Sequence, residues 1–314
     1  MKIALAQIAP VLLDRERTLA KVVDAIAEAG RAGARLVAFG ETLVPGYPIW
    51  LERTGGARFD DDLQKTYFAR YLDQAVTVAS DQLAGVRAAA REHRIVVVLG
   101  VAERGTDRGG HTIYCSRVFV GANGEVESVH RKLVPTHDER LVWGMGDAAG
   151  LVTHPVEDFV VGALNCWENW MPLTRAALQA QGETLRVAIW PGSERNTRDI
   201  TRFMALEGRS YVASVGSVLR PSDVPTDVLA RDLLLAGGER FFTDGGSCVA
   251  GPDGRWLVEP RVGEEAVLYA DIDAEQVRRE RHNFDPSGHY SRPELLRLVV
   301  DRRRYTTCAD ADRE

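Results

Sequence analysis

The sequence places a carboxylate, an ammonium and a thiol after three short apolar runs. Glu41, Lys132 and Cys166 each follow such a run, either directly or within two residues. A thiolate attacks carbon as a nucleophile, a nearby ammonium and a helix N-terminus favour the thiolate form, and a carboxylate shuttles the proton. The three residue types together predict cysteine-based nucleophilic catalysis.

Each of these residue types is also common without any chemical role. Cysteines are often simply buried, and glutamates and lysines are mostly solvated. The joint occurrence at predicted strand ends is more informative, because ligands of open α/β sheets bind beyond the carboxyl ends of strands. We therefore expect Glu41, Lys132 and Cys166 to share one site at a sheet edge.

The elements that must position this site alternate along the chain. Residues 42–56 contain a Pro-Gly-Tyr-Pro turn and are expected to form a loop, and residues 221–246 are expected to be an insertion or an active-site loop. Strands that alternate with single helices and with hairpins indicate an α/β fold with mixed sheets and helices outside. In chain order, the predicted elements are a strand at 2–10, a helix through 19–27, a strand at 35–39, a helix from 80 through 90, a strand at 95–101, a hairpin of 114–120 and 126–130, a strand at 159–165, a helix at 172–181, a strand at 186–190, a helix at about 197–209 and a hairpin that turns at 252–254.

The composition argues against several classes of protein. The 314-residue chain has a formal net charge of -6, whereas nucleic-acid binding needs a basic surface, so we expect no nucleic-acid partner. No apolar run approaches the ~20 residues of a membrane-spanning helix, so no membrane insertion is expected. The four cysteines are far apart and form no C-x-x-C pair. This usage argues against a disulfide framework or a zinc knuckle and favours a cytoplasmic location.

The sequence predicts neither a metal nor a cofactor. His137 lies beside Asp138 and Glu139, but adjacent side chains of an extended segment point in opposite directions and no second histidine pairs with His137. The glycines of residues 144–150 have the spacing G-x-G-x-x-x-G, which differs from the dinucleotide-binding pattern, and no buried strand leads into them.

Four separated segments carry a further pattern. They are Gly40-Glu41-Thr42 with Pro45-Gly46-Tyr47-Pro48, the segment HRKLVPTHDER from His130 to Arg140, Asn165-Cys166-Trp167-Glu168-Asn169, and the segment FDPSGHYSRP from Phe284 to Pro293. In order and spacing they resemble the nitrilase superfamily of carbon-nitrogen hydrolases, and the string at 166–169 resembles its nitrilase branch. The resemblance implies a four-layer αββα sandwich as a single domain over residues 1–314, with residues 286–314 as a C-terminal tail.

The resemblance also implies an assembly. Units of this family often pair through their outer helices into an αββααββα dimer, so we expect a homo-oligomer built from dimers. Nitrilases also tend to build spirals, which a longer tail helps to hold in many relatives. This sequence ends soon after Tyr305, so it predicts no particular higher assembly.

The family mechanism carries over residue by residue. Glu41 would accept the thiol proton of Cys166, whose sulfur attacks the nitrile carbon, and Glu41 would then activate water. Lys132 and the backbone N–H of Trp167 would stabilise the developing charge. Glu139 matches a second glutamate of the family, which would position Lys132 or the substrate; the alternative for Glu139 is a solvated loop carboxylate.

Three aromatic residues are candidates for the substrate pocket. Tyr47, Trp167 and Trp190 each follow a predicted catalytic strand or end a neighbouring one. The alternative is that they belong to the core, where aromatic residues are more often found.

The leading functional hypothesis is the hydrolysis of a small-molecule nitrile to a carboxylic acid and ammonia. An amidase of the same superfamily needs the same three residues, and a cyanide hydratase or dihydratase shares the same Cys-Trp-Glu string. A binding or scaffold protein that keeps the fold without turnover is the alternative from another class. The sequence leaves open whether the nitrile is aliphatic, aromatic or arylacetic.

Overall fold

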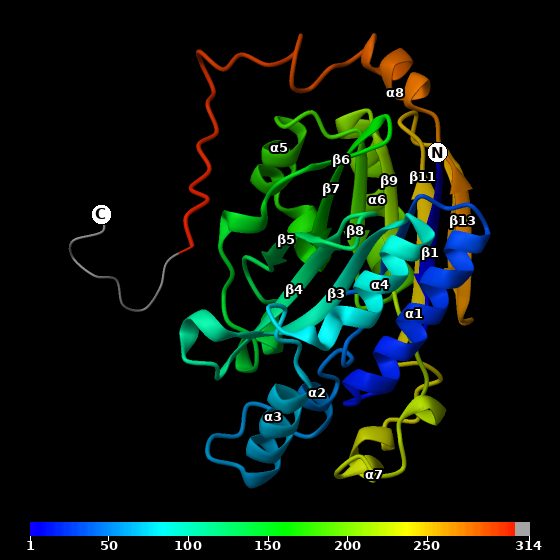
Figure 1. Ribbon diagram of the computed structural model, residues 1–314. Helices are drawn as coiled ribbons and strands as arrows, with labels where there is room; N and C mark the ends of the chain where they lie inside the picture. The colour runs from blue at the N-terminus through cyan, green and yellow to red at the C-terminus, as the bar shows by residue number, and fades with distance from the viewer. Residues whose placement is uncertain (305–314) are drawn as a thin grey trace.

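Two β-sheets stacked face to face, with helices on both outer sides, form the body of the protein (Figure 1). The computed structural model describes residues 1–304. The strands are β1 (Lys2–Gln7), β2 (Leu36–Phe39), β3 (Val96–Gly105), β4 (Thr112–Val120), β5 (Val126–Arg131), β6 (His154–Val156), β7 (Phe159–Asn165), β8 (Leu185–Ile189), β9 (Tyr211–Val215), β10 (Val218–Leu219), β11 (Thr243–Ala250), β12 (Trp256–Val262) and β13 (Ala266–Asp271). The helices are α1 (Arg15–Arg31), α2 (Trp50–Arg53), α3 (Asp62–Gln74), α4 (Ala84–His93), α5 (Pro172–Gln179), α6 (Glu194–Gly208), α7 (Arg231–Leu235) and α8 (Ala274–Arg281).

Both sheets are mixed, as the sequence predicts. The first has the strand order β13-β1-β2-β3-β4-β5, in which β1, β2 and β3 are parallel. Strand β4 is antiparallel to both β3 and β5, so β5 runs in the same direction as β2. The second sheet has the order β10-β11-β9-β8-β7-β6, with β7, β8 and β9 parallel and β12 paired to β11. The carboxyl ends of β2 and β5 therefore lie at one edge of the first sheet.

Alternate residues of each inner strand pack into different layers. In β1, Ile3 and Leu5 join the core between the two sheets, whereas Ala4 and Ala6 join the core beneath α1 and α4. This period of two is what a strand buried on both faces requires. The outer face of the second sheet packs against α5 and α6, for example at Met204. The result is the four-layer αββα sandwich that the resemblance implies.

The segment 42–56 is only partly a loop. It contains the short helix α2, whose Trp50 stacks on Tyr67 of α3 with ring centroids 5.2 Å apart. Helix α3 is absent from the sequence-based prediction, because its buried face consists mainly of two tyrosines and one leucine and shows little apolar periodicity. Tertiary packing of these aromatic rings accounts for both helices.

Helices α2, α3 and α7 lie together at the end of the molecule opposite the N-terminus (Figure 1). Helix α2 contacts α7, and the Tyr67 hydroxyl of α3 donates a hydrogen bond to the carbonyl of Leu229. The segment 221–246 contains α7 and leads into β11 at Thr243. Two segments far apart in sequence therefore meet at the end of the molecule toward which β1 runs.

Residues 286–304 form no helix or strand and extend away from α8 along the outside of the molecule (Figure 1). Near residue 304 the chain touches the body again, where Arg304 pairs with Asp147 at 3.0 Å. Cys308 and the rest of the expected tail lie outside the described residues, and the single-domain assignment stays a prediction. Within residues 1–304, no helix is both long enough and apolar enough to cross a membrane.

Candidate active site

Cys166 sits on a strained turn at the carboxyl end of β7. Its φ angle of 45° lies in the left-handed region, which non-glycine residues seldom adopt. A 3₁₀ helix, Cys166–Trp170, starts at this residue, and α5 follows. The sequence-based prediction of a strand, a thiol and then a helix start is therefore confirmed. Such strain is typical of positions that present a reactive side chain.

Glu168 connects this turn by hydrogen bonds to the end of β5, next to Lys132. Its buried carboxylate accepts hydrogen bonds from the backbone N–H of Asn165 at 3.0 Å and of Leu133 at 2.7 Å, and it contacts His130 Nε2 at 3.1 Å. Burial raises its pKa, but His130 and these hydrogen bonds outweigh burial, so the pKa of Glu168 is lowered. In the sequence, Glu168 stands out only as part of a motif string, and this contact between the two strand ends was not predicted.

Lys132 lies between two buried carboxylates. Its Nζ donates to Glu139 Oε2 at 2.7 Å and lies 3.1 Å from Glu41 Oε1, and all three side chains are almost completely inaccessible to solvent. Tyr47 donates its hydroxyl to Glu139 Oε1 at 2.9 Å, and the Thr136 N–H donates to Oε2 at 2.6 Å. Glu139 is thus a buried, fully engaged carboxylate, and the alternative of a solvated loop residue is wrong.

The four candidate catalytic residues converge on one point. Side-chain ligand atoms of Glu41, Glu139 and Cys166 all lie within 4.8 Å of one another. A set of two carboxylates and a thiol has the donor chemistry of a metal site. Here the Lys132 ammonium already lies within ion-pair distance of both carboxylates and supplies the cation of the cluster.

Cys115 is a fifth residue of the cluster and was not predicted from the sequence. Its Sγ donates to Glu41 Oε1 at 3.3 Å, and its carbonyl accepts the backbone N–H of Lys132 at 2.7 Å. The hairpin of β4 and β5 pairs Ser116 with Arg131 and so places Cys115 opposite Lys132. A register shift next to Val120 separates this pair from the turn, so counting outward from the turn does not predict the contact.

Burial sets the proton affinities of the two reacting groups. It raises the pKa of Glu41 to about 7, helped by Glu139 and opposed by Lys132 and Cys115. Burial, followed by Glu41, also raises the pKa of the Cys166 thiol well above its ordinary value. Lys132 and the Trp167 backbone N–H act in the opposite direction, as the sequence predicts, but they are outweighed. Cys166 therefore rests as a thiol, which agrees with the predicted transfer of its proton to Glu41.

Lys132 stays protonated although its side chain is buried. Burial alone would lower its pKa, yet the acidic groups around it, Cys166 and Glu41 foremost, raise the pKa above the ordinary value. A buried ammonium that stays protonated gives the cluster a fixed positive charge next to the thiol.

The three predicted pocket residues differ in their placement. Tyr47 borders a small cavity together with Glu41. Trp190 is fully buried in the same apolar cluster as Cys166, and its carbonyl accepts the N–H of Glu41 at 2.9 Å. Trp167 is 48% exposed and lies beside the ring of Trp170, with centroids 6.1 Å apart. Contact of these residues with substrate stays a prediction.

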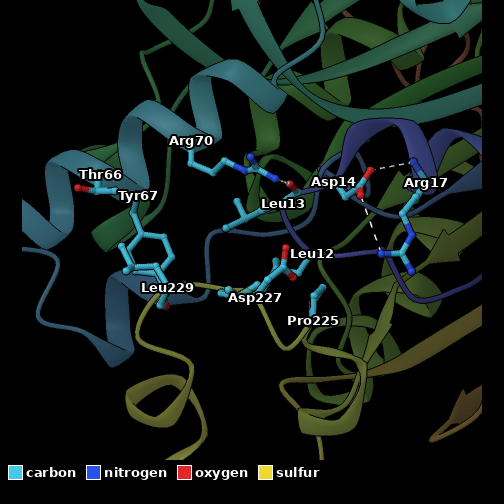
Figure 2. A pocket seen from close by; sticks show the side chains of 11 residues that line it. Leu12, Leu13, Asp14, Arg17, Thr66, Tyr67, Arg70, Pro225, Asp227 and Leu229 are labelled. Atoms are coloured by element: carbon cyan, nitrogen blue, oxygen red, sulfur yellow. Dashed lines mark hydrogen bonds and ion pairs between the residues drawn. The ribbon is translucent and has the colours of Figure 1, made fainter.

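A second pocket lies apart from this cluster. A hollow of about 270 Å³ lies between the start of α1, helix α3 and the segment 225–229, and the side chains that line it are drawn in Figure 2. Charges of both signs line it, with Asp14 and Arg17 on one side and Arg70 reaching toward the carbonyl of Leu13. None of the four candidate catalytic residues is among its lining residues.

Most of the chain is similar to known proteins. The family model described as "Carbon-nitrogen hydrolase" matches residues 2–282. An aliphatic nitrilase of Rhodococcus rhodochrous is 34% identical, over 98% of this chain and 80% of that protein. An arylacetonitrilase of Aspergillus kawachii is 35% identical, over 96% of this chain and 92% of that protein.

Solved structures resemble the fold. A carbon-nitrogen hydrolase from Helicobacter pylori has a TM-score of 0.68 at 19% identity, covering 95% of this chain and 99% of that chain. A cysteine-to-serine variant of the Nesterenkonia amidase from the nitrilase superfamily has a TM-score of 0.65 at 21% identity, covering 90% of this chain and 95% of that chain. At these identities the likeness concerns the αββα architecture alone.

Proposed function

Since this chain belongs to the carbon-nitrogen hydrolase family, we propose that it is a nitrilase, which converts an organic nitrile into a carboxylic acid and ammonia. The observation that carries the proposal is the convergence of Glu41, Lys132 and Cys166 in one buried cluster. Relatives named nitrilase, at about one-third identity over almost the whole chain, support the same reaction.

The reaction begins with the thiol of Cys166. Its sulfur bonds to the nitrile carbon while the thiol proton passes to Glu41 and on to the nitrile nitrogen, which gives a thioimidate. Water activated by Glu41 then adds to that carbon, the C–N bond breaks, and ammonia leaves a thioester. A second water breaks the C–S bond, releases the acid and restores the thiol. A carboxyl pKa of about 7 suits Glu41 to take up and return protons near neutral pH.

Two groups stabilise the charge that develops on nitrogen and oxygen. They are the Lys132 ammonium and the backbone N–H of Trp167, which hydrogen-bonds the sulfur. Glu139 acts through Lys132 as a positioning residue, and the hydroxyl of Tyr47 holds Glu139 in turn. No cofactor is proposed for these steps.

A substrate panel tests this proposal. Purified protein is expected to release ammonia from at least one aliphatic, aromatic or arylacetic nitrile, and the matching amides and free cyanide serve as comparison substrates. Ammonia from amides but none from nitriles would favour the amidase, and turnover of cyanide alone would favour a cyanide hydratase or dihydratase. The Trp167 that follows the nucleophile favours the nitrilase. A protein that turns over none of these substrates would support the non-catalytic scaffold.

Replacement of Cys115 by alanine is expected to shift the acid limb of the pH profile. The Cys115 hydrogen bond lowers the pKa of Glu41, so its loss raises that pKa and moves the acid limb of kcat/KM to higher pH, by about half to one pH unit. The substitution leaves the other groups that face Glu41 unchanged, namely Lys132, Glu139 and Cys166.

The matched control for this experiment is Cys115→Ser, which restores a hydrogen-bond donor and is expected to keep the wild-type limb. The measurement is kcat/KM against pH for the three proteins. An unshifted limb in Cys115→Ala would show that this contact does not tune Glu41.

We also propose that the protein works in the cytoplasm as a homo-oligomer built from dimers. An exposed apolar surface on the 3₁₀ helix, α5 and α6 supports a contact there, since such surfaces mark interaction sites. It includes Trp170, Leu173 and Phe203, and Arg175 of α5 packs over the Phe203 ring of α6. No nucleic-acid or membrane partner is proposed.

A further inference from the structure

A small cavity borders Glu41 and contains two buried hydroxyl groups. Its volume is about 10 Å³, close to what one water molecule requires. Ser217 and Thr243 both line it and are only 5% and 8% exposed. Neither Ser217 Oγ nor Thr243 Oγ1 has a hydrogen-bond partner among residues 1–304. Buried polar groups without a partner are uncommon, so each of these hydroxyls requires an explanation.

Glu41 also lines this cavity. Its Oε1 is occupied by Lys132 at 3.1 Å and by the Cys115 thiol at 3.3 Å. Its Oε2 is buried and has no hydrogen-bond partner in the described part of the chain. The carboxylate therefore keeps one oxygen available to accept a proton.

Close backbone packing holds the two hydroxyls at this place. Ser217 follows β9, and Thr243 begins β11. Gly192 lies between them: a Cβ at this glycine would come within 2.1 Å of the Ser217 carbonyl oxygen and 3.0 Å of Thr243 Cβ. A Cβ on Gly40, the residue before Glu41, would meet Ser217 Oγ at 2.3 Å. The serine hydroxyl thus lies directly against the backbone that carries Glu41.

We propose that this cavity is the site of the hydrolytic water, held by Ser217 and Thr243 and deprotonated by Glu41. The inference rests on the proposed nitrilase function and assigns both hydroxyls as positioning residues. Each hydroxyl can donate one hydrogen bond and accept others, and three polar groups lie within the number that a buried water uses.

The water step balances without any further reactant. The water oxygen bonds to the thioester carbon, one water proton passes to Glu41, and the C–S bond breaks. The proton then passes from Glu41 to the Cys166 sulfur, which leaves the carboxylic acid and a free thiol. The same site serves the earlier addition of water to the thioimidate.

The variants Ser217→Ala and Thr243→Val remove one hydroxyl each with little change in shape. Each is expected to lower kcat about 3- to 10-fold, because a misplaced water slows hydrolysis of the covalent intermediate. The fraction of Cys166 that carries substrate in steady state is expected to rise, as measured by intact-mass spectrometry of acid-quenched turnover. A purely structural defect would lower turnover and adduct together.

Hydroxylamine gives a second readout. It attacks the thioester carbon directly, displaces the Cys166 sulfur and forms a hydroxamic acid, so it does not depend on the water site. It is expected to stimulate turnover more strongly in the two variants than in the wild type. Thr201→Val, which removes a buried hydroxyl bonded to Ser214 at 2.6 Å, is the control and is expected to leave the adduct fraction unchanged.

Unchanged kcat in both variants would overturn the assignment, as would a fall in kcat without more adduct and without stimulation by hydroxylamine. If one of the two variants fails to fold, the other still decides. Failure of the nitrilase proposal looks different, because the wild-type protein would then show no adduct on Cys166 from any nitrile.

Discussion

Cys166→Ala is expected to abolish nitrile hydrolysis while leaving the fold intact. In the proposed mechanism the sulfur is the atom that bonds to the nitrile carbon, and loss of a nucleophile that acts with its base as a unit costs about 10⁴-fold or more in kcat. The substitution removes one buried sulfur and leaves Glu41, Lys132 and Glu139 paired as before. Its effect on the free energy of unfolding is therefore expected to be about 1–2 kcal/mol.

Ammonia release and thermal unfolding measure the two halves of this prediction. Cys248→Ala is the matched control, because Cys248 is equally buried but contacts Thr201 at 3.5 Å and none of the candidate catalytic residues. This control is expected to keep its activity. Turnover by the Cys166→Ala protein above about one-hundredth of the wild-type rate would contradict the role of the sulfur.

Lys132→Met is expected to damage both catalysis and stability. Loss of a charge-stabilising donor typically lowers kcat by about 10²–10³-fold. The same substitution leaves Glu41 and Glu139 buried side by side without their cation, and breaking a buried ion pair in this way costs about 3–5 kcal/mol.

The stability loss should depend on pH. Removal of Lys132 takes away a group that lowers the pKa of Glu41, so that pKa rises further above about 7. A carboxyl whose pKa is higher in the folded than in the unfolded state stabilises the fold at low pH, and this contribution is lost as pH rises through the folded-state pKa. Lys132→Met is therefore expected to lose more stability at pH 8 than at pH 5.

Denaturant unfolding at the two pH values measures this difference. The double variant Lys132→Met with Glu139→Gln keeps only one of the two carboxylates and is expected to recover part of the stability but none of the activity. Equal stability losses at both pH values, or activity restored in the double variant, would contradict the assigned roles of Lys132 and Glu139.

The sequence was sufficient to predict the strand ends that carry Glu41, Lys132 and Cys166. Glu41 and Cys166 follow short apolar runs, which is the simple pattern of a strand buried on both faces, and Lys132 follows the second arm of a predicted hairpin. Glu139 was recognised through its place in a family segment. The alternation of strands with single helices and hairpins was sufficient to predict mixed sheets with helices on their outer faces.

Other parts of the site depend on contacts that no local pattern contains. Cys115 contacts Glu41 because the register of the hairpin places Cys115 opposite Lys132. Glu168 accepts hydrogen bonds from backbone N–H groups at strand ends of two different sheets. The raised pKa of the Cys166 thiol depends on how completely the folded chain excludes water, which no sequence pattern contains. The hydroxyls of Ser217 and Thr243 are candidates for holding the hydrolytic water only because the structure buries them without a hydrogen-bond partner.

The most direct test of the account is the mass of the protein during turnover. Wild-type enzyme is mixed with a nitrile that it hydrolyses, quenched in acid and analysed by intact-mass spectrometry and peptide mapping. We predict an added mass equal to that of the nitrile or of its acyl group, located on the peptide that contains Cys166. Steady turnover with the adduct on Cys115 or Cys248, or with Cys166 unmodified at every time point, would contradict the account.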